Sequence, residues 1–183
     1  MQALSWNPRV PRDSLPGLRR LARREGLGMF GFYERSDNGK RRPLGLRQDY
    51  VPVFYIEPVA GNEAAIGFDV GSNNARRVAL DLARDTGKAI ATAAINLVQE
   101  TGKQPSILVF RPVYINGQRP KSLAARRLSV MGYAVGVYCI GDILSSALGT
   151  GDGPQTSLAI YDEIAGGFSK RSLYAWRRKS AES

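Results

Sequence analysis

The chain has 183 residues, which is long enough to bury a hydrophobic core and predicts one domain or two small ones. It contains no histidine, which excludes Ser-His-Asp and Cys-His catalysis and the common zinc sites, and its single cysteine excludes an intrachain disulfide. The formal net charge of +10 favours partners of negative charge, while a hydrophobic fraction of 43% indicates a folded protein.

The first half of the chain is predicted to contain one helix and several extended segments. The helix spans 14–25, because Ser14 can cap it, Gly26 suits its C-terminal end, and leucines recur on one face. Aromatic and β-branched residues predict strands or extended segments after this helix. These segments lie at 29–33, 40–44 and 50–57, with a turn at Asn38-Gly39 between the first two.

A second helix, over 73–86, has the clearest pattern in the sequence. Ser72 or Asn73 can cap it, Gly87 can end it, and apolar residues recur within it at helical spacing. Three strands that are most simply antiparallel follow, at 89–99, 106–114 and 131–140. The remaining predicted elements are a short helix at 142–148, a loop at 149–154, and strands at 158–164 and 172–176.

This order of elements predicts an α+β fold in which helices pack against an antiparallel sheet. It is also the order of PAS-type sensor modules, which hold a small ligand between the sheet and a covering helix. The longest uncharged stretch, 128–141, is too short to span a membrane. The N-terminal residues show no signal-peptide pattern, so we expect no membrane segment within this sequence.

The carboxylates that could perform acid–base chemistry lie close together at Glu57, Glu63 and Asp69. No activated nucleophile accompanies them and their spacing matches no metal loop, so we expect them to cap turns and to pair with arginines. The glycine-rich run 149–153 lacks the Gly-Lys-Ser/Thr ending of a phosphate loop. We therefore predict no catalytic residue, no metal ion and no cofactor.

Arg76 and Arg77 lie in the predicted first turn of the helix over 73–86. Cations are unfavourable there, because a helix N-terminus carries partial positive charge. Arginine side chains beside free backbone N–H groups are nevertheless well suited to bind an anion. The alternative is that both side chains extend into solvent or pair with Asp69 and Asp81.

Basic residues also form short clusters along the whole chain. They can make a solvated basic surface, contact an anionic membrane surface, or bind the phosphate backbone of a nucleic acid. No helix-turn-helix, zinc finger or aromatic RNA-binding strand supports the last alternative. The clusters are Arg19-Arg20, Arg23-Arg24, Lys40-Arg41-Arg42, Arg76-Arg77, Arg126-Arg127, Lys170-Arg171 and Arg177-Arg178-Lys179.

Several segments together resemble the CHASE domain, the extracytoplasmic sensory module of membrane receptors. The resemblance runs from about residue 2 to residue 162, and it depends on the order and spacing of the segments. They include Tyr50-Val-Pro-Val-Phe-Tyr-Ile-Glu-Pro58, Gly61-Asn-Glu-Ala-Ala-Ile-Gly67-Phe-Asp69, Ala83-Arg-Asp-Thr-Gly-Lys88, Val109-Phe-Arg-Pro-Val-Tyr114 and Ile160-Tyr-Asp162.

The resemblance implies a stalk helix followed by two PAS-like modules. Residues 1–25 are then a remnant of the stalk region, 26–140 the membrane-distal, ligand-binding module, and 141–183 part of the membrane-proximal module. The resemblance further implies a homodimer formed through the stalk, with the sensor in the periplasm and a histidine kinase or diguanylate cyclase in the cytoplasm. We expect the chain to be a sensor fragment, with the membrane helices and the output domain outside it.

The resemblance also places the ligand pocket. Plant members bind cytokinins through a carboxylate near the start of the pocket helix, and Arg76 occupies that position here. A guanidinium group only donates hydrogen bonds, so Arg76 implies an anionic ligand such as a carboxylate or a phosphate. The other predicted ligand-binding residues are Val70, Arg77, Val98 through its backbone, Val109, Tyr133 and Gly136. Two alternatives stay open: a basic nucleic-acid-binding protein, and a dimerisation module without a ligand.

Overall fold

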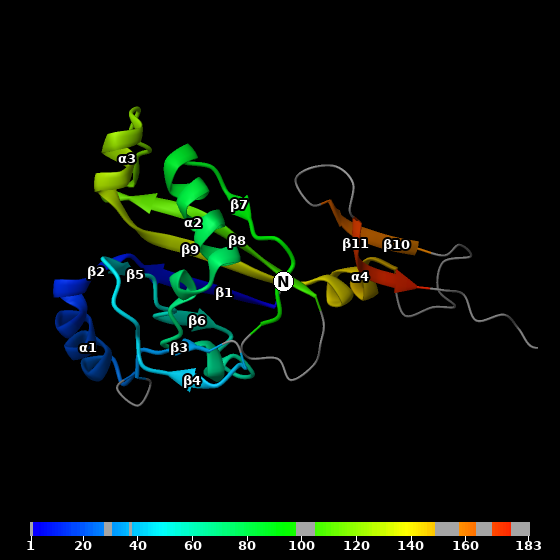
Figure 1. Cartoon of the computed structure of the whole chain (residues 1–183), viewed down its shortest axis with the longest axis horizontal. Coiled ribbons are helices and arrows are strands. Elements are labelled where there is room, and N and C mark those ends of the chain that lie inside the picture. Colours follow the sequence, from blue (N-terminus) through cyan, green and yellow to red (C-terminus); the bar gives the residue numbers. More distant parts are fainter. Residues whose placement is uncertain are drawn as a thin grey trace, which may run out of the picture.

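The computed structural model describes residues 2–27, 31–36, 38–97, 105–148, 158–163 and 170–176. Its central feature is a five-stranded antiparallel sheet with the strand order β6-β1-β9-β8-β7. The strands are β1 (Ala3–Pro8), β6 (Tyr55–Glu57), β7 (Ile90–Ala91), β8 (Ser106–Tyr114) and β9 (Val130–Cys139). Helix α2 (Asn74–Thr86) covers one face of this sheet (Figure 1). The predicted α+β fold is confirmed.

The longest strands, β8 and β9, pair along their length and form the centre of the sheet. Leu108 lies opposite Val137, and Phe110 lies opposite Val135. Alternate residues of a strand point to the same face, so these four side chains form one apolar surface. They belong to the main hydrophobic core, together with the buried residues of α2.

Helix α2 agrees with the helix predicted over 73–86. Its N-cap is Asn73, whose side chain accepts a hydrogen bond from the backbone N–H of Arg76. It ends at Gly87, which has a φ of +69° that glycine adopts readily. The apolar side chains that α2 buries are Ala79, Leu80 and Ala83, and it also buries Arg76 in its first turn.

Strand β1 was not predicted, and it lies inside the sheet between β6 and β9. Trp6 pairs with Tyr55 on one side and with Ala134 on the other. The strand buries Ser5 and Asn7 and exposes Leu4, which is the reverse of the usual hydrophobic alternation. Residues 3–8 therefore belong to the sheet that α2 covers, while the assignment of 1–25 to a stalk remnant stays a prediction of the resemblance. The division into modules at residues 140 and 141 stays a prediction.

Small elements surround one end of the sheet. They are β2 (Val10–Pro11), a 3-10 turn (Arg12–Ser14), α1 (Leu15–Arg24), β3 (Glu34–Arg35), β4 (Arg41–Arg42), β5 (Asp49–Tyr50), and 3-10 turns at Glu63–Ala65 and Val70–Ser72. Strand β2 pairs with β5, and β3 pairs with β4. The helix predicted over 14–25 is confirmed, whereas the strands predicted over 40–44 and 50–57 are shorter or interrupted. Within 29–33, Tyr33 forms an isolated bridge to Phe68, and 29–30 lie outside the described residues.

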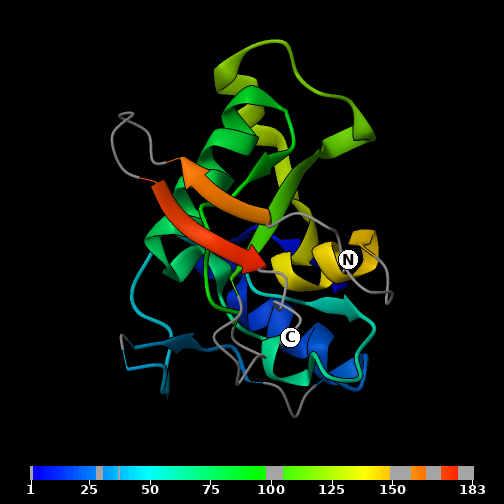
Figure 2. The same ribbon diagram turned by 90° about the vertical axis from the view of Figure 1, so that its right-hand side faces the viewer.

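The C-terminal part contains four further elements and a 3-10 turn (Ile115–Gly117). Helix α3 (Leu123–Ser129) joins β8 to β9 and was not predicted. Helix α4 (Ile140–Leu148) follows β9, and β10 (Leu158–Glu163) pairs with β11 (Lys170–Trp176) in a hairpin that faces the viewer in Figure 2. The strands and the helix predicted in this part are confirmed to within a few residues. The loop predicted over 149–154 lies outside the described residues.

The strand predicted over 89–99 is largely wrong. Among its described residues, 89–97, it pairs only at β7 and at Ile95, which bridges to Ser106, and 98–99 lie outside the described residues. Thr92 interrupts the ladder: its N–H donates to the Leu108 carbonyl, but its side-chain oxygen accepts from the Leu108 N–H. A side chain thus replaces a backbone acceptor at this point, and the chain leaves the sheet edge.

Candidate ligand-binding site

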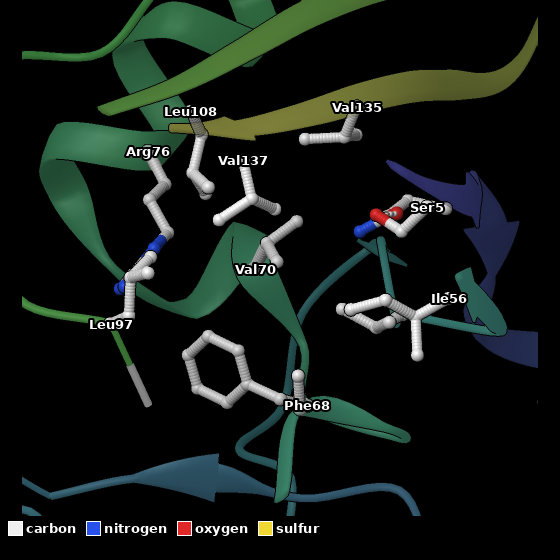
Figure 3. A pocket seen from close by; sticks show the side chains of 12 residues that line it. Ser5, Ile56, Phe68, Val70, Arg76, Leu97, Leu108, Val135 and Val137 are labelled. Carbon is white, nitrogen blue, oxygen red and sulfur yellow. Dashed lines mark hydrogen bonds between the residues drawn. The ribbon is translucent and has the colours of Figure 1, made fainter. Parts of the chain in front are cut away.

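A small cavity lies between the sheet and the segment that leads into α2 (Figure 3). Its volume is about 30 Å³, and most of its wall is apolar. In Figure 3, Arg76 and Leu97 lie on one side of it, and Ser5 and Ile56 lie on the other. The lining residues are Ser5, Asn7, Val53, Ile56, Ala65, Phe68, Val70, Arg76, Leu97, Leu108, Val135 and Val137.

Arg76 is the charged residue of the cavity wall. It extends from the first turn of α2, and only 6% of its surface is exposed. Its Nη2 donates a 3.1 Å hydrogen bond to the Asn96 carbonyl, and its Cζ lies 5.2 Å from the centre of the Phe68 ring. Its buried Nε has no hydrogen-bond partner among the described residues. The contacts of Arg76 therefore leave its buried Nε–H group without an acceptor among the described residues.

Within the described part of the chain, no acidic residue balances the charge of Arg76. No carboxylate of the described residues forms an ion pair with it. Burial, and to a lesser extent the charge of Arg35, lowers the pKa of Arg76 to about 10. Arg76 is thus still protonated at neutral pH, as a buried cation beside a second cation. Such a charge is costly in the absence of a counter-ion.

A larger, polar pocket adjoins the cavity. Its volume is about 670 Å³, and Phe68, Arg76 and Leu97 line both spaces. Its three arginines and the N-terminus of α2 give it positive potential, although Arg42 forms a 3.0 Å ion pair with Glu34. The lining residues are Arg35, Ser36, Gly39, Arg42, Phe68, Ser72, Asn73, Asn74, Arg76, Asn96 and Leu97.

Arg77, the next residue along α2, has two acidic partners. It forms ion pairs with Asp49 at 2.9 Å and with Asp81 at 3.2 Å. Arg9 also binds Asp49, at 2.6 Å. Burial acts to raise the pKa of Asp49, but hydrogen bonds from Arg77 and Arg9 outweigh it and lower the pKa below its usual value of 3.8. Arg77 thereby ties α2 to β5 and does not line the cavity.

Asp69 holds the segment that precedes α2. Its Oδ1 accepts hydrogen bonds from the backbone N–H groups of Val51 (2.8 Å) and Gly71 (3.1 Å). Its Oδ2 accepts a 2.8 Å hydrogen bond from Arg47, which also binds Glu34. These bonds fix the backbone between Phe68 and Val70, and both of those side chains line the cavity. The expectation that Asp69 pairs with an arginine is confirmed, with Arg47 as the partner.

Of the predicted ligand-binding residues, the structure brings Val70 and Arg76 together at the cavity. Val109 and Gly136 pair with each other in the sheet, one position away from the cavity-lining residues of β8 and β9. Alternation along the strands therefore turns both to the opposite face. A Cβ at Gly136 would lie 2.7 Å from the Tyr138 ring, so this glycine makes room for Tyr138 and not for a ligand in this cavity.

Two predicted residues remain. Tyr133 is buried on the same face as Val135, two residues before it in β9. Its ring packs edge-on against Phe110, with 6.1 Å between the ring centres. Burial raises the pKa of Tyr133, so it stays neutral within the core. Val98 lies outside the described residues.

Sequence reasoning missed the polar end of the cavity, which β1 supplies. Asn7 is fully buried, and its Oδ1 accepts a 2.7 Å hydrogen bond from the Ser5 hydroxyl. Its Nδ2 has no partner among the described residues. The only sequence signal for these residues is a short alternation in which the inward positions are polar.

A sheet covered by one helix, with a small cavity on the sheet face beside the start of that helix, fits the architecture of a PAS-like ligand-sensing module. The CHASE domain family model matches residues 1–174, and the chain therefore belongs to the CHASE domain family. CHASE domains are extracytoplasmic sensor modules of signalling receptors and are not themselves catalytic. No curated protein matches the chain. Among the described residues, the structure contains no helix with the length and apolarity that a membrane span requires.

Proposed function

We propose that this chain senses a small anionic molecule through Arg76 and reports its binding to a cytoplasmic histidine kinase or diguanylate cyclase. Membership of the CHASE family supports the sensory role, and the surroundings of Arg76 support the charge of the ligand. The receptor context includes flanking membrane helices, a periplasmic position for this domain, and a homodimer formed through the stalk. These last features follow from the family resemblance alone.

One observation carries the ligand assignment: Arg76 is a buried cation that forms no ion pair with any carboxylate of the described residues. Other arginines around it are neutralised, since Arg77 binds Asp49 and Arg47 binds Asp69. A bound anion would supply the missing negative charge and accept from the unused Nε donor. It would also reduce the repulsion between Arg76 and Arg35.

The position of Arg76 offers a route from binding to signalling. Arg76 and Arg77 are neighbours in the first turn of α2, and Arg77 ties that turn to Asp49 and, through Asp49, to Arg9. A ligand that pulls on Arg76 would bias the position of this turn and of the N-terminal segment joined to it. The ligand shifts the population of receptor states only if it binds the two states with different affinity, typically by about 1–3 kcal/mol.

The test is thermal unfolding of the 183-residue chain in the presence of acetate, butyrate, succinate or inorganic phosphate. At 100 times its Kd, a ligand adds about 2.7 kcal/mol of stability, which corresponds to about 7 °C in Tm for a chain of this size. We expect at least one anion to give a saturable rise in Tm. Arg76→Gln should remove this rise, and the exposed Arg19→Gln on α1 should retain it.

The result that would contradict the proposal is a rise in Tm that is the same in Arg76→Gln and in the unmodified chain. Such a rise would come from a general effect of salt or from another site. The absence of any rise with all four anions, each at millimolar concentration, would also count against an anion sensor at Arg76.

A further inference from the structure

Two compartments of different chemistry meet at Arg76. The polar pocket lies at the start of α2, and the apolar cavity lies between the sheet and the segment that leads into α2. Phe68, Arg76 and Leu97 belong to the walls of both. A ligand whose anionic group lies against Arg76 can therefore extend from the pocket into the cavity.

The cavity limits what can enter it. Its volume of about 30 Å³ corresponds to roughly two or three water-sized groups, at about 10–15 Å³ for each. Its side walls are formed by aliphatic side chains, among them Val70, Leu108 and Val137, and by the Phe68 ring (Figure 3). These walls suit a short carbon chain and exclude a ring system or a second charged group.

The far end of the cavity is polar. Asn7 is fully buried there, and its Oδ1 accepts a hydrogen bond from the Ser5 hydroxyl. The Nδ2 group has no acceptor among the described residues, which is also true of Arg76 Nε at the near end. Unsatisfied buried donors are rare in folded proteins because each costs free energy. The cavity thus presents one unused donor at each end and apolar walls between them.

We infer that the ligand is a short-chain monocarboxylic acid with an acceptor oxygen at the far end of its chain. This inference rests on the proposed function and specifies its ligand. The carboxylate lies against Arg76, the carbon chain fills the apolar cavity, and the distal hydroxyl or oxo oxygen accepts from Asn7 Nδ2. Inorganic phosphate satisfies only Arg76, and a dicarboxylate places a second charge against aliphatic side chains.

Two acids with equal numbers of heavy atoms test whether the polar far end of the cavity binds an acceptor oxygen. Pentanoate ends in a methyl group where 4-hydroxybutyrate ends in a hydroxyl group. In a calorimetric titration of the full chain, we expect 4-hydroxybutyrate to bind about five-fold more tightly, which is the gain from one hydrogen bond. Asn7→Leu removes the donor with little change of volume, and it should reduce the ratio of the two affinities to about one.

A second variant tests the cavity independently of Asn7. Val137→Leu adds a methylene group to the cavity wall. It should therefore weaken the binding of 4-hydroxybutyrate and leave the affinity for acetate nearly unchanged. Succinate and phosphate complete the series, and both should bind at least ten-fold more weakly than 4-hydroxybutyrate. The fold of each variant is checked by its Tm without ligand.

The inference is overturned if phosphate or succinate binds as tightly as 4-hydroxybutyrate and both variants leave the order of affinities unchanged. If that binding still requires Arg76, the anion sensor stands and only the ligand class is wrong. If none of the acids and no phosphate binds, the proposed function fails together with the inference.

Discussion

Two adjacent residues of α2, Arg76 and Arg77, have contrasting electrostatic environments. Arg77 is half-buried and shares two carboxylates, whereas Arg76 is more deeply buried and has none among the described residues. The fold therefore supplies counter-ions to a buried arginine where the arginine is structural. Leaving Arg76 without one gives up stability at a single position, as binding sites commonly do.

The largest effect is expected from removing the acid that Arg77 and Arg9 share. Asp49→Ala leaves both arginines without this partner, and we expect the free energy of unfolding to fall by about 3 kcal/mol. Chemical denaturation measures the fall, with the exposed Asp13→Ala as the control, for which a change within about 0.5 kcal/mol is expected. A loss below about 1 kcal/mol for Asp49→Ala would show that this network is not structural.

A matched pair of substitutions sharpens the comparison further. Arg77→Met should lower the free energy of unfolding by about 1–2 kcal/mol, because it leaves Asp49 and Asp81 with fewer partners. Arg76→Met removes an uncompensated buried charge, so the unfolding free energy without ligand should stay constant or rise. Chemical denaturation of both variants in ligand-free buffer measures the two changes in unfolding free energy. If Arg76→Met is the more destabilising of the two, the contrast between them is wrong.

A smaller effect is the loss of stability that we expect at low pH. The pKa of Asp49 is lower in the folded chain than its usual value of 3.8, so its ion pairs stabilise the protein fully above about pH 5. This contribution is lost as the pH falls through the folded pKa. Unfolding free energies measured between pH 6 and pH 2 should therefore decline below about pH 4. The decline should be less steep in Asp49→Ala and unchanged in Arg76→Met.

How far the sequence predicts this site depends on the kind of signal at each residue. Helix α2 and strands β8 and β9 have strong periodic patterns, and Arg76 is conspicuous because a cation at a helix N-terminus is locally unfavourable. The ion pair between Arg77 and Asp49 joins residues 28 positions apart, and no local pattern reveals such a pair.

Two differences between the expectation and the structure have a common physical origin in strand geometry. Val109 and Gly136 were expected at the pocket, but a shift of one residue along a strand moves a side chain to the opposite face. Strand β1 was missed because its inward positions, Ser5 and Asn7, are polar and its outward Leu4 is apolar. The residues that give the cavity its polar end are thus the same ones that obscure the strand pattern.

The most direct test of the account follows the Nε–H group of Arg76 by ¹H–¹⁵N NMR of the arginine side chains. The Arg76 signal is assigned by its disappearance in Arg76→Gln. We predict that titration with 4-hydroxybutyrate moves this signal to saturation, as the Nε donor gains an acceptor, while the signal of Arg77 changes little. Ligand binding that leaves the Arg76 signal in place, or that moves the arginine signals uniformly, would contradict an anion site at this residue.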